Sequence, residues 1–303
     1  MPSTITHSYI SLDVYDKLNK NAINLIQNNL ENFKSFAQGM DILYFYHFIN
    51  QKNDVIKLGH RFHHFKTNEV FKYIIEYNKI NNDPIVFALL SGLKTHYVAD
   101  STIHPYVNYL ANNDKKIEHQ NKHFEIETVI DNYMLKIHNE NYQQYKGWKL
   151  QFNNKKDEKI VDLLNKLFEK FFNVKNIGPK YYKGLKEMRL VFKYFRYDKY
   201  GIKRKFYHLI DKNHLNVRRI SYLSYHFNLD NLDYYLNTKH NEWYNIRNKN
   251  IKSNKSFKDL YNDVVLKASN IINNLYDYIY LNKNVDIDTL IGNNSYSNGL
   301  PLN

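Results

Sequence analysis

One apolar segment, residues 85–99, constrains the fold more than any other part of the chain. Asp83-Pro84 precedes it, and proline is well tolerated in the first turn of a helix. The segment is almost wholly apolar or small, and a helix that is apolar on nearly all sides is buried by its neighbours. We therefore expect a central helix that ends at Pro105 and carries His96 and Asp100 near its far end.

Helical patterns also dominate the rest of the chain. Only nine Gly and five Pro interrupt it, and apolar residues recur at three- and four-residue steps. Further helices are predicted over residues 13–36, 65–77, 118–138, 155–172, 179–195 and 257–280, and a polar connector over 248–255. The sequence predicts an all-α fold in a single, mostly helical domain over 1–303. Its metal-site core would span about 1–140 and its C-terminal helical part about 141–303.

Composition excludes several kinds of site and organisation. The chain has no Cys, which excludes disulfides, thiolate zinc sites, iron–sulfur clusters and Cys nucleophiles. No apolar run approaches the roughly 18 residues of a membrane span. The first residues lack the basic-then-apolar pattern of a signal peptide. We therefore expect a cytoplasmic protein.

The net charge of +13 is unevenly distributed. Residues 180–219 hold 13 Lys or Arg against three acids, a local balance of +10. Such a zone favours anionic partners, either the phosphate backbone of a nucleic acid or the headgroups of an anionic membrane surface. The alternative is a solvated surface in a chain that is rich in Lys and Asn throughout.

Two short motifs carry the side chains that metal ions prefer. His96 and Asp100 are four residues apart, and so are His123 and Glu127. On a helix this spacing places an imidazole and a carboxylate on the same face. Helices present pairs of metal ligands in this way. The alternatives are a buried polar pair for the first motif and a solvated helix face for the second.

The full set of candidate ligands contains five His and three carboxylates. They are His7, Asp41, His60, His96, Asp100, His104, His123 and Glu127. Imidazole with carboxylate suits zinc best, then manganese or iron. Eight ligands are too many for one tetrahedral ion, but they suit two or three ions. Such a cluster hydrolyses phosphoesters by activating a bound water, without a protein nucleophile.

Several candidates have structural alternatives that the sequence leaves open. Asp41 could cap the following helix, and His104 could bond a free carbonyl at a helix end. His7 could lie on the surface near the chain end. His63 and His64 compete with His60 for one ligand position, and we favour His60.

The sequence resembles the zinc-dependent phospholipase C family, whose trinuclear zinc fold is shared with single-strand-specific fungal nucleases. The resemblance begins at Met1-Pro2-Ser3-Thr4 and continues through Gly39-Met40-Asp41, Gly59-His60, His96-Tyr97-Val98-Ala99-Asp100, His104-Pro105-Tyr106, and His123 with Glu127. It is most similar to the clostridial-type branch without a signal peptide. The features shared with that branch are Trp243, Ser256-Phe257 and a tail with Ser295-Tyr296 and Gly299-Leu300-Pro301.

The resemblance implies how the ligands divide among the ions. One ion would be held by Asp41, His60, His96 and Asp100. A second would be held by His104, His123 and Glu127. A third would take the amino terminus of the chain, which is Pro2 after removal of Met1, together with His7 and the bridging Asp100. Asp41 would also orient or deprotonate the attacking water.

The function implied is that of a zinc-dependent phosphodiester hydrolase with two to three zinc ions. The expected reaction is that of a phospholipase C, in which zinc-bound hydroxide attacks the headgroup linkage of a phospholipid. Another phosphodiester could serve as substrate. A nuclease of the same fold is the alternative enzyme, although nucleic acid fits less well. A non-catalytic, metal-stabilised binding protein is the alternative from a different class.

Overall fold

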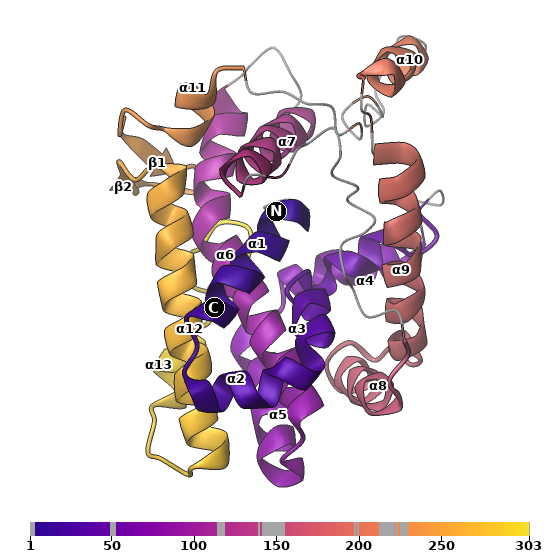
Figure 1. The fold of residues 1–303 in the computed structure, drawn as a ribbon, viewed down its shortest axis with the longest axis vertical. Helices are drawn as coiled ribbons and strands as arrows, with labels where there is room; N and C mark the ends of the chain where they lie inside the picture. The colour runs from indigo at the N-terminus through magenta and orange to yellow at the C-terminus, as the bar shows by residue number, and fades with distance from the viewer. Residues whose placement is uncertain are drawn as a thin grey trace.

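The structure is a computed structural model that describes most of the chain as helices (Figure 1). The described residues are 4–48, 53–113, 119–138, 140, 155–196, 198, 200–211, 221, 224 and 230–302. Within them, the only strands are β1 (Trp243–Asn245) and β2 (Asn248–Ser253), which pair in antiparallel fashion. The all-α prediction is confirmed, although residues 248–253 form a strand where we expected a polar connector.

The described helices follow one another along the chain in this order. The first part of the chain forms α1 (Thr4–Asp16), α2 (Lys20–Ile26), η1 (Gln27–Asn29), α3 (Leu30–Phe36), η2 (Gly39–Phe45), α4 (Asp54–His63) and α5 (Thr67–Asn81). The long helices α6 (Pro84–Asn113) and α7 (His119–Ile137) come next. The later part forms α8 (Glu158–Phe172), α9 (Ile177–Val191), a π-helical turn (Phe192–Arg196), α10 (Ile202–Asp211), α11 (Leu232–Leu236), α12 (Phe257–Tyr280) and α13 (Ile287–Ile291).

Helix α6 is the centre of the fold. It is 30 residues long and contacts α3, α12 and α7. Figure 1 shows it running along the molecule beside α12. Its apolar first half is buried on nearly all sides, as in Val86, Leu89, Leu90 and Leu93. The expectation of a buried central helix is confirmed, and the helix holds its polar residues in fixed positions within the core.

The prediction that this helix ends at Pro105 is wrong. Proline lacks the N–H that would bond the Ser101 carbonyl, and inside a helix this costs about 3 kcal/mol. Burial of each large apolar side chain contributes about 1.5–3 kcal/mol, which offsets that loss. Such burial continues beyond the proline at Tyr106, Val107 and Leu110. The backbone of Gly299, at φ +68°, packs so closely over the Ser101 carbonyl that no Cβ would fit there.

The predicted helix over 13–36 is also wrong as a single element. It corresponds to the end of α1, followed by α2, η1 and α3. Asn19 begins α2, because its side chain accepts a hydrogen bond from the Ala22 N–H at 2.8 Å. Asparagine is among the preferred N-cap residues. The apolar spacing persists across this break, so periodicity alone does not show it.

The helix predicted over 257–280 agrees with α12 at both ends. Ser256 and Asp259 form a capping box at its start, in which each side chain bonds the backbone of the other. Among the described residues, no helix combines the length and the apolar character that are needed to cross a membrane.

Candidate metal centre

Two groups of histidine and carboxylate side chains gather along α6. The first group contains His7, Asp41, His96 and Asp100, and the second contains His104, His123 and Glu127. Within each group the nearest ligand atoms all lie within 4.8 Å of one another. Helix α6 contributes to both groups because His96, Asp100 and His104 follow at four-residue steps, about 6 Å apart along the helix axis.

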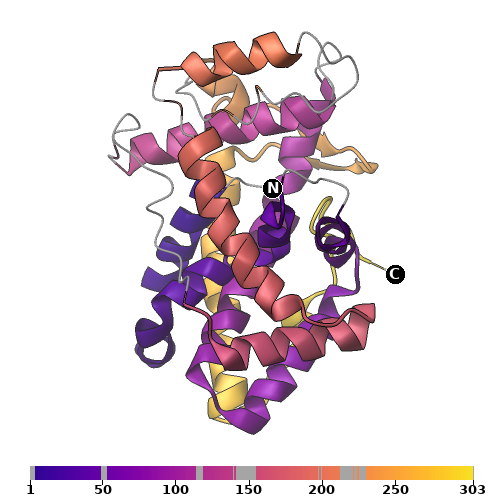
Figure 2. The same ribbon diagram turned by 90° about the vertical axis from the view of Figure 1, so that its right-hand side faces the viewer.

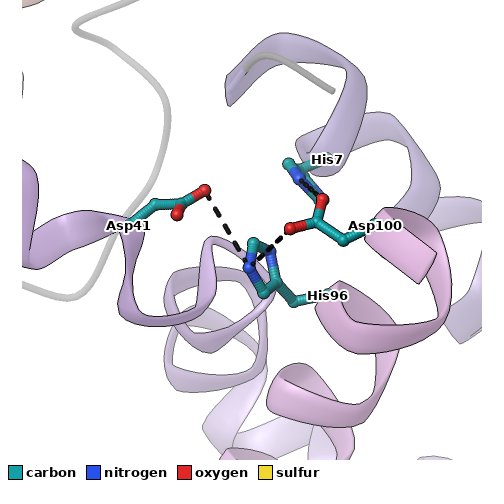
Figure 3. Close-up of side chains that lie close together, drawn as sticks. All are labelled: His7, Asp41, His96 and Asp100. Atoms are coloured by element: carbon teal, nitrogen blue, oxygen red, sulfur yellow. Dashed lines mark ion pairs between the residues drawn. The ribbon is translucent and has the colours of Figure 1, made fainter. Parts of the chain in front are cut away.

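Asp100 is the centre of the first group (Figure 3). Its Oδ1 lies 3.2 Å from His7 Nε2, and its Oδ2 lies 3.3 Å from His96 Nε2. Asp41 Oδ2 faces the same His96 nitrogen at 3.9 Å. His7 comes from α1 and Asp41 from η2, so three separate segments meet at one carboxylate.

The approach of η2 to α6 depends on Gly39. This residue has φ +58°, a conformation that side-chain-bearing residues rarely adopt. A Cβ at this position would overlap the imidazole of His96. Gly39 therefore lets the η2 backbone pass directly over the His96 ring, and it places Asp41 two residues later at the same site.

The buried ligand atoms of the first group lack hydrogen-bond partners. Within the described part of the chain, both Asp100 oxygens and the Nε2 atoms of His7 and His96 make no hydrogen bond, although they lie 3.2–3.3 Å apart. Each unsatisfied buried polar atom costs about 1–3 kcal/mol. An ion at which all of these lone pairs point would remove this cost. The residues present therefore fit a metal ion.

Electrostatics set the protonation states that a metal requires. Burial lowers the pKa of His96 to about 4, which favours its neutral form. Burial also acts against ionisation of Asp100, but the neighbouring His96 and His7 outweigh it and hold the pKa of Asp100 below its usual value. Neutral imidazole and ionised carboxylate are the forms that bind metal ions.

His63, and not His60, lies beside Asp41. His63 Nε2 is 3.1 Å from Asp41 Oδ1, and its Nδ1 is 2.8 Å from the Gly59 carbonyl. A carbonyl only accepts, so Nδ1 carries a proton, which leaves Nε2 as the nitrogen that could bind a metal, as in many metal-bound histidines. His60 is exposed and its ring packs against Tyr44. The structure thus brings His63 to Asp41, which makes His63 the better-placed candidate, while the ligand role chosen for His60 stays a prediction.

The reason lies in the two faces of α4. Its exposed side, continued at the C-cap, carries Lys57, His60, Arg61 and His64. Its buried side carries Val55, Leu58, Gly59, Phe62 and His63. The apolar spacing of Val55, Leu58 and Phe62 was visible in the sequence. It would have placed His63 on the buried face, because His63 follows Gly59 by one helical turn.

The second group joins α6 to α7. His123 Nε2 and Glu127 Oε1 lie 2.9 Å apart on α7, and the ring centroids of His104 and His123 are 5.6 Å apart. His104 Nδ1 donates to the Tyr296 carbonyl at 2.7 Å, so its Nε2 is left with a lone pair. That Nε2 is buried and has no hydrogen bond in the described structure. His104 thus bonds a carbonyl of the distant tail from within α6, and not one at a helix end as the structural alternative supposed, while its other nitrogen remains available to a metal.

Tyr296 in the C-terminal tail touches both groups. Its carbonyl fixes His104, and its buried ring lies 4.9 Å from the His63 ring and 5.9 Å from the His96 ring, centroid to centroid. Sequence reasoning identified this tyrosine only as part of a tail motif. Nothing in local spacing signals the contact, because 192 residues separate His104 from Tyr296.

One stripe of α6 holds the main chain of this tail. The side chains of Lys94 and Asn108 donate to the carbonyls of Ile291 and Ser297, and the Tyr97 hydroxyl accepts from the Asn294 N–H. With His104, these residues follow at steps of three, seven and four, so they share one side of the helix. The tail is therefore fixed along the same helix that carries the ligands.

A comparison with models of known protein families shows which family the chain belongs to. A family model described as zinc dependent phospholipase C matches residues 5–177. The chain belongs to the zinc-dependent phospholipase C family. No curated protein and no solved structure matches it.

The match to the zinc-dependent phospholipase C family covers both ligand groups from His7 to Glu127, whereas the tail with Tyr296 lies beyond it. Pro2, the expected terminal ligand, lies outside the described residues. Both groups could hold a metal ion through nitrogen and oxygen donors.

Proposed function

We propose that the protein is a zinc-dependent phosphodiester hydrolase of the phospholipase C type that acts on the headgroup linkage of phospholipids. The observation that carries this proposal is the group around Asp100, whose buried ligand atoms point at one another without hydrogen bonds. Membership in a zinc-dependent phospholipase C family supports the choice of ion and reaction.

The two groups suit two to three zinc ions. Asp41, His63 and His96 would hold one ion with Asp100. The second group, His104, His123 and Glu127, would hold another. His7 faces the opposite oxygen of Asp100, so a third ion would share that carboxylate with the first. Asp100 is the bridge in this scheme.

Bound zinc would supply two effects, a lowered pKa for a coordinated water and compensation of the charge on the phosphoryl oxygens. Asp41 is the residue that we assign to the attacking water. Its two oxygens face different histidines: Oδ1 lies 3.1 Å from His63 Nε2, and Oδ2 lies 3.9 Å from His96 Nε2. One oxygen can therefore accept a proton from the water while the other remains among the metal ligands. Water adds to phosphorus, the bond from phosphorus to the glycerol oxygen breaks, and that oxygen takes a proton.

An assay with two substrate classes tests the proposal. Purified, zinc-loaded protein is incubated with dispersed phosphatidylcholine, phosphatidylethanolamine or phosphatidylserine, and the release of diacylglycerol and the phosphorylated headgroup is measured. A parallel reaction contains single-stranded DNA. We expect release from at least one lipid, and we expect Asp41→Asn to lose it while it remains folded.

Two other outcomes contradict the proposal. Cleavage of DNA without lipid hydrolysis would identify a nuclease of the same fold. Zinc binding without either activity would identify a metal-stabilised binding protein. The fold and the ligand groups would stand in both cases, so only the assigned substrate or the assigned catalysis would be overturned.

A further inference from the structure

Helix α10 turns an apolar face to solvent. Ile202, Phe206 and Leu209 follow at steps of four and three residues, so they share one side of the helix. Their side chains are 66%, 60% and 60% exposed, and no residue of α10 is buried. Figures 1 and 2 both place this helix at the edge of the molecule.

Polar side chains of α10 make its hydrogen bonds to the preceding turn. Lys203 Nζ donates to the Tyr194 carbonyl at 2.8 Å, and the Tyr207 hydroxyl donates to the Phe195 carbonyl at 3.2 Å. The buried carboxylate of Asp198 accepts from the backbone N–H groups of Lys203 and Arg204, which anchors the start of the helix. A surface helix normally faces its apolar side inward. In α10 this arrangement is reversed.

The apolar face continues onto the preceding turn and is bordered by cations. Tyr194, Phe195 and Tyr200 are 56%, 40% and 69% exposed. Lys193 and Lys205 are exposed beside them. Two carboxylates lie near these lysines in the sequence: Asp198 is buried and accepts hydrogen bonds from the start of α10, and Asp211 at the end of α10 is half-buried and accepts from the Ser221 N–H.

We propose that this face, Ile202, Phe206 and Leu209 with Tyr194 and Tyr200, docks the protein on an anionic phospholipid bilayer. Helices that combine apolar and aromatic side chains with Lys and Arg lie in the membrane interface, where the apolar face enters the headgroup boundary. The cations are attracted to anionic lipids. Protein–protein contact surfaces are instead depleted in Lys. The inference rests on the proposed function, in which the substrate lies in such a bilayer.

Vesicle co-sedimentation tests the docking face. Full-length protein is mixed with vesicles of phosphatidylcholine, either alone or with phosphatidylserine. We expect binding to the mixed vesicles that weakens with added salt, because exposed charges are screened. The double variant Phe206→Ser/Leu209→Ser should bind at least about tenfold more weakly.

An exposed leucine outside the docking face supplies a matched control. Leu266 on α12 is 62% exposed, so Leu266→Ser removes an equally exposed apolar side chain. This variant should bind vesicles as the wild type does. Equal binding by the double variant and the wild type would overturn the proposal, as would loss of binding in Leu266→Ser. A wild-type dimer in the absence of lipid that the double variant converts to monomer, without vesicle binding, would identify a second copy as the occupant.

A soluble substrate separates docking from catalysis. Short-chain phospholipid below its micelle concentration needs no docking, so the double variant should hydrolyse it at the wild-type rate. Hydrolysis of this lipid without vesicle binding by the wild type would overturn the docking face and leave the proposed function intact. Vesicle binding without hydrolysis of any lipid would overturn the proposed function and leave the docking face intact.

Discussion

The two ligand groups use the same donor chemistry in different surroundings. The first is buried throughout and is assembled from α1, η2 and α6, with His63 of α4 beside it. The second is formed by α6 and α7, and the side chain of His123 remains 17% exposed. The first group therefore depends on the whole N-terminal fold, whereas the second depends on one helix pair and the tail. We expect the first group to bind its ion more tightly and the second to exchange its ion more easily.

Asp100→Asn should have the largest effect, because it removes the carboxylate that both histidines of the first group face. Asparagine keeps the size but loses the charge. We expect loss of more than one zinc ion and a fall in activity on the order of 10³-fold. Metal analysis and lipid hydrolysis measure the two effects.

Asp198→Asn is the matched control for that variant, since Asp198 is equally a buried aspartate but caps α10. It should keep its zinc and its activity on short-chain lipid. An Asp100→Asn protein that keeps all its zinc and its activity would refute the bridging role.

Glu127→Gln should remove one ion only, because it weakens the second group and leaves Asp100 untouched. Activity should fall on the order of 10²-fold. Dialysis of the wild type against a chelator should show the same order of events, with one ion leaving quickly and the others slowly. Simultaneous loss of all ions would mean that the two groups do not differ as described.

His63→Ala and His60→Ala form a pair that tests which of the two histidines is the ligand. His63 lies beside Asp41, whereas His60 is exposed on the same helix. Loss of an outer-shell partner costs about 10- to 100-fold in metal affinity, so we expect at least that loss of zinc affinity in His63→Ala, which removes a direct ligand, and none in His60→Ala. The reverse result would restore the choice made from the sequence.

Tyr296→Ala should have the smallest effect on zinc, because the His104 bond is made by the main-chain carbonyl and survives the change. Loss of the buried ring leaves a cavity beside His63 and His96, so the free energy of unfolding should fall by about 3 kcal/mol. Zinc affinity should fall only a few-fold. Thermal melting and zinc titration separate the two effects, and an unchanged melting temperature would contradict the packing described here.

The parts of the fold that local sequence determines could be predicted. An apolar helix must be buried, and an i, i+4 spacing must place His96 with Asp100 and His123 with Glu127. Contacts between distant segments could not be derived in this way. The Tyr296 carbonyl on His104 and the backbone of Gly299 over the Ser101 carbonyl both come from the distant C-terminal tail.

Two other features show the limits of pattern reasoning. The choice between His60 and His63 depended on which face of α4 meets Asp41, and the apolar spacing contained that information. Helix α10 has a regular amphipathic pattern, but its reversed orientation follows from bonds to Tyr194, Phe195 and Asp198 that no local pattern encodes.

The metal content of the purified protein tests the central claim most directly. The protein is prepared without chelator in the presence of zinc and is dialysed to remove unbound ions. The number of zinc ions per chain is then measured by elemental mass spectrometry. Buried ligand atoms without hydrogen bonds around Asp100 predict two or three tightly held zinc ions per chain. One ion or none, in a folded protein, would contradict the proposed shared cluster.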